Sequence, residues 1–328
     1  MHGELRTVPF LFGADDGMWR NVMASSAALM SRKWVTGRAV GRRIEELDPV
    51  VGNEEATHLS LEVRYGDAIF AHAAYTVAFA RQVAIPSIAR ILYRTGTGDM
   101  MHDVRRRNDD TLLFFGEMLH HGHSSEYGRS FIDRMEQIHS RFGITDDDKL
   151  YTLGSLAFEP DRIVEHLGLS VFTDNEREAR FHFWRQVGEY MGLDVPQTRE
   201  RFLRWTFDYE SRYAHTDGAR KIVDQLFVDW QERWFPGRTR RFADGILLSV
   251  FTEDLRAIHR LPEPSRGHRL VVPPAIGAYL AFQGVRPHRP HRSWSDHFGT
   301  RHPKPLDIPT LGHRKPIART IRPTGESH

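Results

Sequence analysis

Residues 105–142 read RRRNDDTLLFFGEMLHHGHSSEYGRSFIDRMEQIHSRF, and two helices predicted within this stretch decide the fold. Gly122 and the candidate capping residues Ser124 and Ser125 separate a helix expected at 105–121 from one expected at 126–142. The second helix carries an apolar stripe, which consists of Phe131, Met135, Ile138 and Phe142. Because the turn between the helices is short, we expect them to pack as an antiparallel hairpin.

His139 borders this apolar stripe, next to Ile138. A histidine on an apolar helix face is more often a hydrogen-bonded core residue than a metal ligand, and both interpretations stay open. The preceding helix carries a second stripe at helical spacing, polar at its start and mostly apolar afterwards: Arg107, Asp110, Thr111, Phe114, Met118 and His121. The spacing allows a solvent-facing salt bridge from Arg107 to Asp110, or a buried stripe that presents a cation and a hydroxyl to a cavity.

Hairpin geometry favours the cavity. A turn centred near residues 123–124 places His139 level with Asn108, beside Arg107 and Thr111. Two such helices can clasp a flat ligand, with histidine on one face and Arg and Thr on the other, as globins hold haem. The separation of Thr111 and His139 along the chain resembles the distal-to-proximal spacing of globins.

Other metal chemistry is also conceivable here. Glu117-x-x-His120 and Glu136-x-x-His139 match the pair of Glu-x-x-His motifs in di-iron carboxylate bundles. The hairpin puts the two pairs at different levels, so we do not expect them to share one metal pair. His120, His121 and His123 stand at a helix end, where the helix dipole accounts for them without a metal.

The rest of the chain predicts further helices and no strand, so the fold class is all-α. An Ala-rich helix at 68–92 is expected to change direction at Pro86. Thr145 opens the next helix, which Pro160 breaks and Gly168 ends, and Thr173 opens another at 174–191. Helices at about 197–213, 216–234 and 240–258 follow.

Composition limits the class of protein. The 328 residues include no Cys, which excludes disulfides, iron–sulfur clusters and covalently attached c-type haem and fits a reducing compartment. The N-terminus lacks the apolar core of a signal peptide, and the uncharged run 270–285 contains Pro273 and Pro274 and is too short to span a bilayer. We therefore expect a cytoplasmic protein without a transmembrane segment, which leaves room for peripheral contact with a membrane.

The C-terminal tail, residues 285–328, differs from the body. It holds nine Lys or Arg against three Asp or Glu, and seven of the 17 prolines. The basic pI therefore belongs to the tail and does not indicate that the body binds nucleic acid. We expect residues 1–284 to form the helical domain and the tail to be an extended arm that wraps the body or stays mobile.

Four motifs in order resemble the MpaB/rubber-oxygenase (latex-clearing protein) family over residues 55–235: AIPSIARILYRTG (84–96), RRNDDTLLFFGEMLHHG (106–122), RMEQIHSRFGITDDDKLYTL (134–153) and FHFWRQVGEYMG (181–192). The resemblance implies an enlarged globin-like fold that carries non-covalent haem b, with His139 as the proximal iron ligand. It matches the distal Arg-x-x-Lys-Thr set of rubber oxygenases to Arg107, Asp110 and Thr111. Asp110 replaces the lysine, and Ile91 stands where those enzymes have a glutamate, which weakens the case for rubber-type ligation and for rubber as the substrate.

The resemblance further implies an oxygenase that uses dioxygen to cleave a C=C bond of a hydrophobic, unsaturated or isoprenoid substrate. Arg107 would stabilise a haem propionate or bound dioxygen. Thr111 would donate a hydrogen bond or, alternatively, bond back to the carbonyl of Arg107. Asp110 would partner Arg107, while Phe114 and Met118 would supply an apolar wall. Two alternatives remain: a haem sensor or carrier of globin type, and a helical interaction protein without a cofactor.

Overall fold

A computed structural model describes residues 29–312, and within them the fold is almost entirely helical, as predicted. The expectations for the N-terminus and for the last part of the tail fall outside these residues. β1 (Val35–Thr36) and β2 (Pro287–His288) form a two-stranded antiparallel sheet that the sequence did not predict. The chain otherwise folds as helices α2 (Gly37–Glu46), α3 (Asn53–His58), the π-helix η1 (Leu59–Arg64), α4 (Ala68–Val83), α5 (Pro86–Tyr93), the 3₁₀ turn η2 (Arg94–Gly96), α6 (Asp99–His102), α7 (Val104–His121), α8 (Glu126–His139), α9 (Asp146–His166), α10 (Asp174–Tyr190), α11 (Arg199–Tyr209), η3 (Glu210–Arg212), α12 (Asp217–Trp234), η4 (Gly237–Thr239), α13 (Arg240–Val250), α14 (Glu253–Ile258), α15 (Arg266–Gln283), α16 (Ser295–Phe298), η5 (Gly299–Arg301) and η6 (Ile308–Thr310).

Side-chain caps set the start of the helices around the predicted hairpin. Ser125 accepts a hydrogen bond from the backbone N–H of Gly128 at 2.9 Å and so begins α8. Thr145 caps α9 in the same way, and Thr173 forms a full capping box with Glu176 at the start of α10. These helix starts confirm the predictions from the sequence.

Prolines have different effects at different sites. The chain bends by 107° between α4 and the segment that begins at Pro86, as predicted. The prediction that Pro160 breaks a helix is wrong, because α9 continues through it from Asp146 to His166. A proline removes one helical hydrogen bond at a cost of about 3 kcal/mol, and the buried residues on both sides of Pro160 hold α9 in place against that cost. Of the described helices, no single one is long and apolar enough to cross a bilayer, although the bent pair α4 and Pro86–Gly96 meets that test by length and composition.

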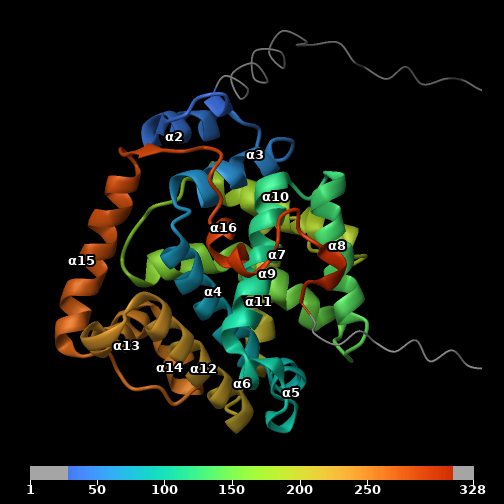
Figure 1. Cartoon of the computed structure of the whole chain (residues 1–328), viewed down its shortest axis with the longest axis vertical. Coiled ribbons are helices and arrows are strands. Elements are labelled where there is room, and N and C mark those ends of the chain that lie inside the picture. Colours follow the sequence, from blue (N-terminus) through green and yellow to red (C-terminus); the bar gives the residue numbers. More distant parts are fainter. Residues whose placement is uncertain (1–28, 313–328) are drawn as a thin grey trace, which may run out of the picture.

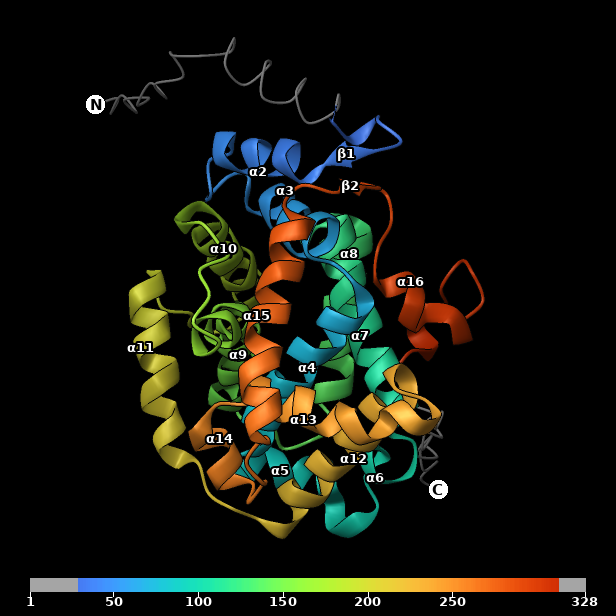
Figure 2. The same cartoon turned by 90° about the vertical axis from the view of Figure 1, so that its left-hand side faces the viewer.

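The helices form one core around α4, α7 and α9. α4 packs on α9 and α12, and α10 packs on α9 and α3. Figure 1 shows α7 near the centre of the molecule with α8 to its right. Figure 2, turned by 90°, shows α15 as a long outer helix in front of α4 and α9. The hairpin therefore contributes residues of α7 and α8 to the core, while α15 lies on another side of it.

Residues 285–312 run back over the body and pack on it. Trp294, Phe298 and Leu311 are buried, and Arg134 of α8 donates two hydrogen bonds to the carbonyl of Leu311, at 3.1 and 2.9 Å. Of the two forms expected for the tail, these residues take the one that wraps the body. The boundary expected at 284/285 therefore does not separate them from the helical domain in space.

Candidate active site

α7 and α8 pack against each other and bring the two predicted stripes to one internal cavity. His139 is the last residue of α8, and Arg107 lies in the first turn of α7. Both line a cavity of about 180 Å³, together with Asp110, Thr111 and Phe114. The structure therefore brings to one cavity His139 and four residues of the stripe that the sequence indicated on the preceding helix.

The rest of the α7 stripe lies elsewhere. Met118 is fully buried in the hydrophobic core and is not among the residues that line this cavity. His121, one turn further, is exposed beside Glu117, with 3.5 Å between Nε2 and the carboxylate. The expected contribution of Met118 to the cavity wall is thus wrong, because the stripe leaves the cavity after Phe114 and Phe115.

The imidazole of His139 is oriented by a carboxylate. Its Nδ1 lies 3.4 Å from Oε1 of Glu136, and Oε2 of Glu136 accepts a hydrogen bond of 2.8 Å from Nζ of Lys149. Contact with His139 and Lys149 lowers the pKa of Glu136. At 3.4 Å the contact is too long for an aligned hydrogen bond, and the buried Nδ1 of His139 has no hydrogen-bond partner among the described residues. This arrangement turns Nδ1 towards Glu136, so Nε2 is the nitrogen left for a ligand.

Arg107 and Thr111 are joined to each other. The Thr111 hydroxyl donates to the backbone carbonyl of Arg107 at 2.8 Å and accepts from the Arg107 guanidinium. Within residues 29–312 no carboxylate lies within ion-pair distance of Arg107, and Asp110 pairs instead with Arg106 at 3.1 Å and His302 at 2.9 Å. The expected partnership of Asp110 with Arg107 is therefore wrong. Arg107 therefore brings to the cavity a positive charge that no described carboxylate contacts directly, although Asp99, Asp110 and Asp148 also line it.

Some residues of the cavity were not found from the sequence. Tyr75 of α4 lines it, and its hydroxyl donates a hydrogen bond of 3.0 Å to Asn108. Burial raises the pKa of Tyr75 well above its usual range, so the phenol stays protonated. Lys149 and Arg94 add further cations to the lining. Tyr75 lies on an Ala-rich helix that is distant in the sequence, and only the tertiary fold brings it to the hairpin.

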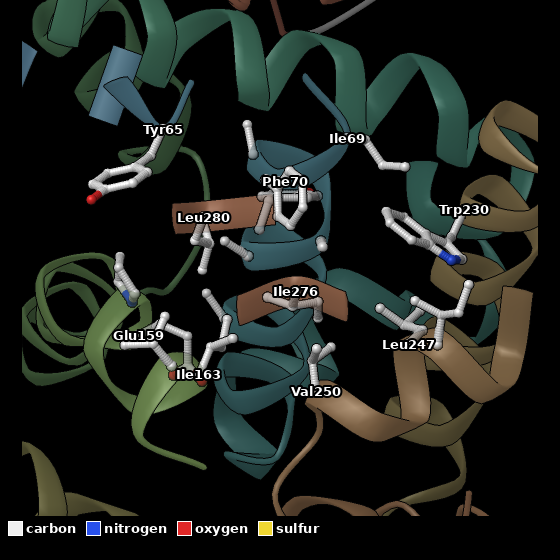
Figure 3. Close-up of a pocket in the computed structure, with 18 of the residues that line it drawn as sticks. Tyr65, Ile69, Phe70, Glu159, Ile163, Trp230, Leu247, Val250, Ile276 and Leu280 are labelled. Carbon is white, nitrogen blue, oxygen red and sulfur yellow. The ribbon is translucent and has the colours of Figure 1, made fainter. Parts of the chain in front are cut away.

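A second and larger cavity adjoins the first. It has a volume of about 860 Å³ and is lined almost entirely by apolar side chains of α4, α9, α12, α13 and α15. Figure 3 shows Phe70, Trp230, Ile276 and Leu280 around this space, with Glu159 at one side. Glu159 accepts from Arg81 at 2.6 Å, so its charge is paired. Four side chains line both cavities and form the wall between them: Tyr75, Phe115, Leu156 and Trp184.

The two Glu-x-x-His pairs do not share a site. Glu136 contacts His139 and Lys149, whereas Glu117 accepts from Ser295 at 2.9 Å and lies beside His121. His120 instead contacts Glu62, at 3.1 Å. This separation agrees with the expectation that the pairs do not build a di-iron centre.

The geometry defines a helical domain in which a cavity lined by histidine and arginine adjoins an apolar chamber. Comparison with known protein families places this domain. Residues 63–283 match a family described as "ER-bound oxygenase mpaB/B'/Rubber oxygenase, catalytic domain", and the chain belongs to that family. The matched residues include the helices α4 to α15, which contain the hairpin and line both cavities, and all the candidate site residues.

Three fungal proteins are similar to part of the chain. ER-bound oxygenase mpaB of Penicillium brevicompactum is 29% identical over 163 residues, which cover 44% of this chain and 42% of that protein. ER-bound oxygenase mpaB' of the same organism is also 29% identical, over 38% of its length. The mpaB oxygenase of Penicillium roqueforti is 27% identical over 55% of its length. The chain therefore spans about half, or less, of the length of these relatives.

Proposed function

We propose that this protein is a haem b-dependent oxygenase, which uses dioxygen to cleave a C=C bond of a hydrophobic, unsaturated or isoprenoid substrate. One observation carries the proposal: His139 and Arg107, from antiparallel helices, line one cavity that adjoins a large apolar chamber. The family's description as oxygenases supports the reaction class.

The residues present suit haem b. His139 supplies an imidazole nitrogen for the iron, and Glu136 holds the other nitrogen, which is the usual way in which proteins orient a ligating histidine. Arg107, Arg94 and Lys149 are cations that can pair with propionates. A haem macrocycle is larger than a cavity of about 180 Å³, so lining side chains, among them the flexible Met135 and Met191, must move apart when it binds. When bound, the haem iron would supply the dioxygen chemistry.

Arg107 is the residue best suited to stabilise negative charge near the iron. A guanidinium carries five N–H donors, and only one of them is needed for the contact with Thr111. Donors that remain free in a cavity with little water act strongly on developing charge. Thr111, whose hydroxyl bonds back to the backbone, would position Arg107.

The 860 Å³ chamber would hold the substrate. Its lining fits a long apolar chain and offers few groups that would anchor a polar one. The shared wall of Tyr75, Phe115, Leu156 and Trp184 would place one part of that chain next to the iron. We further propose a cytoplasmic location with at most peripheral contact with a membrane, which the absence of cysteine supports.

The experiment measures oxygen consumption by the haem-loaded protein with an unsaturated lipid and with its saturated counterpart. We expect turnover of the unsaturated lipid alone. In the variant Ala74→Phe, a ring enters the chamber, so kcat/KM should fall at least about tenfold while haem content stays unchanged. Ala281→Phe, on the exposed surface of α15 and outside the chamber lining, is the matched control and should behave like the parent.

Three other outcomes would contradict the proposal or a part of it. Stoichiometric haem without any turnover of unsaturated lipids would favour a sensor or carrier of globin type. A folded protein that binds no haem would favour a helical interaction protein. Equal activity in Ala74→Phe and the parent would show that the substrate does not bind in the large chamber.

A further inference from the structure

A second cluster of metal-ligating side chains lies outside both cavities. We propose that His58, Glu62 and His120 bind one divalent transition-metal ion, with the chemistry of a Zn²⁺ site. One imidazole nitrogen from each histidine and one carboxylate oxygen of Glu62 lie within 4.8 Å of one another. Nothing in the proposed oxygenase function requires this cluster, so the two proposals can fail separately.

The distances suit a metal ion. Oε2 of Glu62 lies 2.7 Å from Nδ1 of His58 and 3.1 Å from Nδ1 of His120. Bonds of roughly 2.0–2.2 Å to a tetrahedral Zn²⁺ place neighbouring ligand atoms about 3.3 Å apart. The two distances to Oε2 of Glu62 would therefore each have to increase, by about 0.6 Å for His58 and about 0.2 Å for His120, when an ion binds between the three side chains. Two histidines and one glutamate form a known ligand set for zinc sites with one open position.

The cluster is held in place by three distant parts of the chain. His58 ends α3, Glu62 lies one turn later in the π-helix η1, and His120 is near the end of α7. π-Helices are rare and occur frequently at functional sites. Ser293, in the segment after β2, donates a hydrogen bond to the other oxygen of Glu62. This contact fixes the carboxylate and leaves Oε2 directed to the two histidines.

Burial and charge also favour a cation. The side chain of Glu62 is 0% exposed and that of His58 is 9% exposed. The buried carboxylate of Glu62 lies within 3.1 Å of both imidazoles, and its negative charge would stabilise a bound cation.

The fourth position can reach solvent. Glu62 lines a third cavity, of about 460 Å³, together with Asp67, Ser293 and Asp296. His120 is 25% exposed. A water molecule could therefore complete the shell, and the ion would tie α3 and η1 to the end of α7 that lies opposite Arg107. We infer a mainly structural role for it, because none of the three ligands lines the His139 cavity.

The test is a calorimetric titration of the full chain with Zn²⁺, after purification without a metal resin and dialysis against EDTA. We expect one tight site. Glu62→Gln and His120→Ala should weaken it at least about a hundredfold, since loss of an outer-shell partner alone costs roughly 10–100-fold. The matched control is His121→Ala, which removes the adjacent, more exposed imidazole and should bind like the parent.

Circular dichroism and haem content, measured on each variant, separate loss of the site from misfolding. Zn²⁺ should also raise the Tm of the parent and of His121→Ala but not that of Glu62→Gln. The proposal is overturned if the parent has no stoichiometric site, or if the folded Glu62→Gln and His120→Ala variants bind Zn²⁺ like the parent. An equal loss in His121→Ala would likewise overturn it, because the ion would then sit elsewhere.

Discussion

The Thr111 hydroxyl has a single hydrogen, and the backbone carbonyl of Arg107 takes it. Its lone pairs remain for the Arg107 guanidinium. A hydrogen bond from Thr111 to bound dioxygen would therefore require this local bond to break. At the scale of single residues, the proposed function therefore assigns the chemical role to Arg107 and the role of positioning Arg107 to Thr111.

Two substitutions test this division. Arg107→Ala should retain the fold and slow turnover roughly ten- to two-hundred-fold, the loss expected for one charge-assisted hydrogen bond of about 1.5–3 kcal/mol. Thr111→Val keeps the shape and removes the hydroxyl, so its effect on kcat should be smaller. Steady-state oxygen consumption at saturating substrate measures both. A Thr111→Val variant that loses as much activity as Arg107→Ala would assign the hydroxyl a direct part.

Local spacing explains which site residues the sequence revealed. Arg107, Asp110, Thr111 and Phe114 lie within two turns of one helix, and helical periodicity alone places them on one face. Met118 follows the same periodicity but lies beyond the end of the cavity, whose extent depends on other helices. Glu62 and His58 also stand one turn apart, but such a pair alone does not indicate a metal site. Only the fold brings His120 beside them.

Helix packing supplies a pH-dependent contact between α14 and α4. His259, directly after α14, is fully buried and donates from Nε2 to the carbonyl of Ala80 at 2.8 Å. Burial lowers the pKa of His259 to about 4. As the pH falls below about 6.5, the unfolded chain binds a proton at this histidine before the folded chain does, so stability is lost until the folded pKa is reached.

The expected loss is up to about 1.4 kcal/mol per pH unit between about pH 6.5 and 4. His259→Gln retains an N–H donor and does not titrate, so its free energy of unfolding should fall less steeply with pH. Urea unfolding of both proteins at pH 7, 6 and 5 measures the difference. The buried His72 titrates in the same direction in both proteins and cancels. If the free energies of unfolding of the parent and of His259→Gln fell with pH in parallel, His259 would take up protons equally in the folded and the unfolded chain.

The short helix α16 anchors the C-terminal arm. Phe298 is 0% exposed and packs edge-on against Trp294, His72 and His297. We expect Phe298→Ala to lower the free energy of unfolding by about 3–5 kcal/mol, the usual cost of a large cavity in a core. Phe282→Ala on α15 removes a ring that is 56% exposed and should change stability by no more than about 0.5 kcal/mol. Equal midpoints of denaturant unfolding for the two variants would show that the arm does not stabilise the body.

The sequence predicted the helix starts correctly but not the effect of Pro160 or the packing of the arm, and the difference has a physical reason. Caps such as Thr145 and Thr173 act on their own first turn, so a local pattern suffices to find them. Pro160 and the arm depend on packing partners far away in the chain. Pro160 stays within a helix because buried residues on both sides of it hold that helix in place. The Pro-rich basic segment packs on the body where Trp294 and Leu311 are buried.

The whole molecule joins three regions that the sequence could not relate to one another. The hairpin carries the His139 cavity, and α15 closes the apolar chamber on another side (Figures 1 and 2). The arm passes η1 after β2, packs on α7 through α16 and then reaches α8 through η6. The helices of the described residues confirm the all-α assignment made from helix punctuation. The position of the chamber next to the histidine cavity is new information from the fold.

The central claim is that His139 holds haem b. Titration of the purified protein with haemin, followed by its absorption spectrum, tests this claim most directly. The account predicts one haem per chain in the parent and in His121→Ala, whose histidine lies outside the cavity lining. It predicts the loss of stoichiometric binding in His139→Ala, at an unchanged helical circular dichroism spectrum. A folded His139→Ala protein that still binds one haem per chain would contradict it.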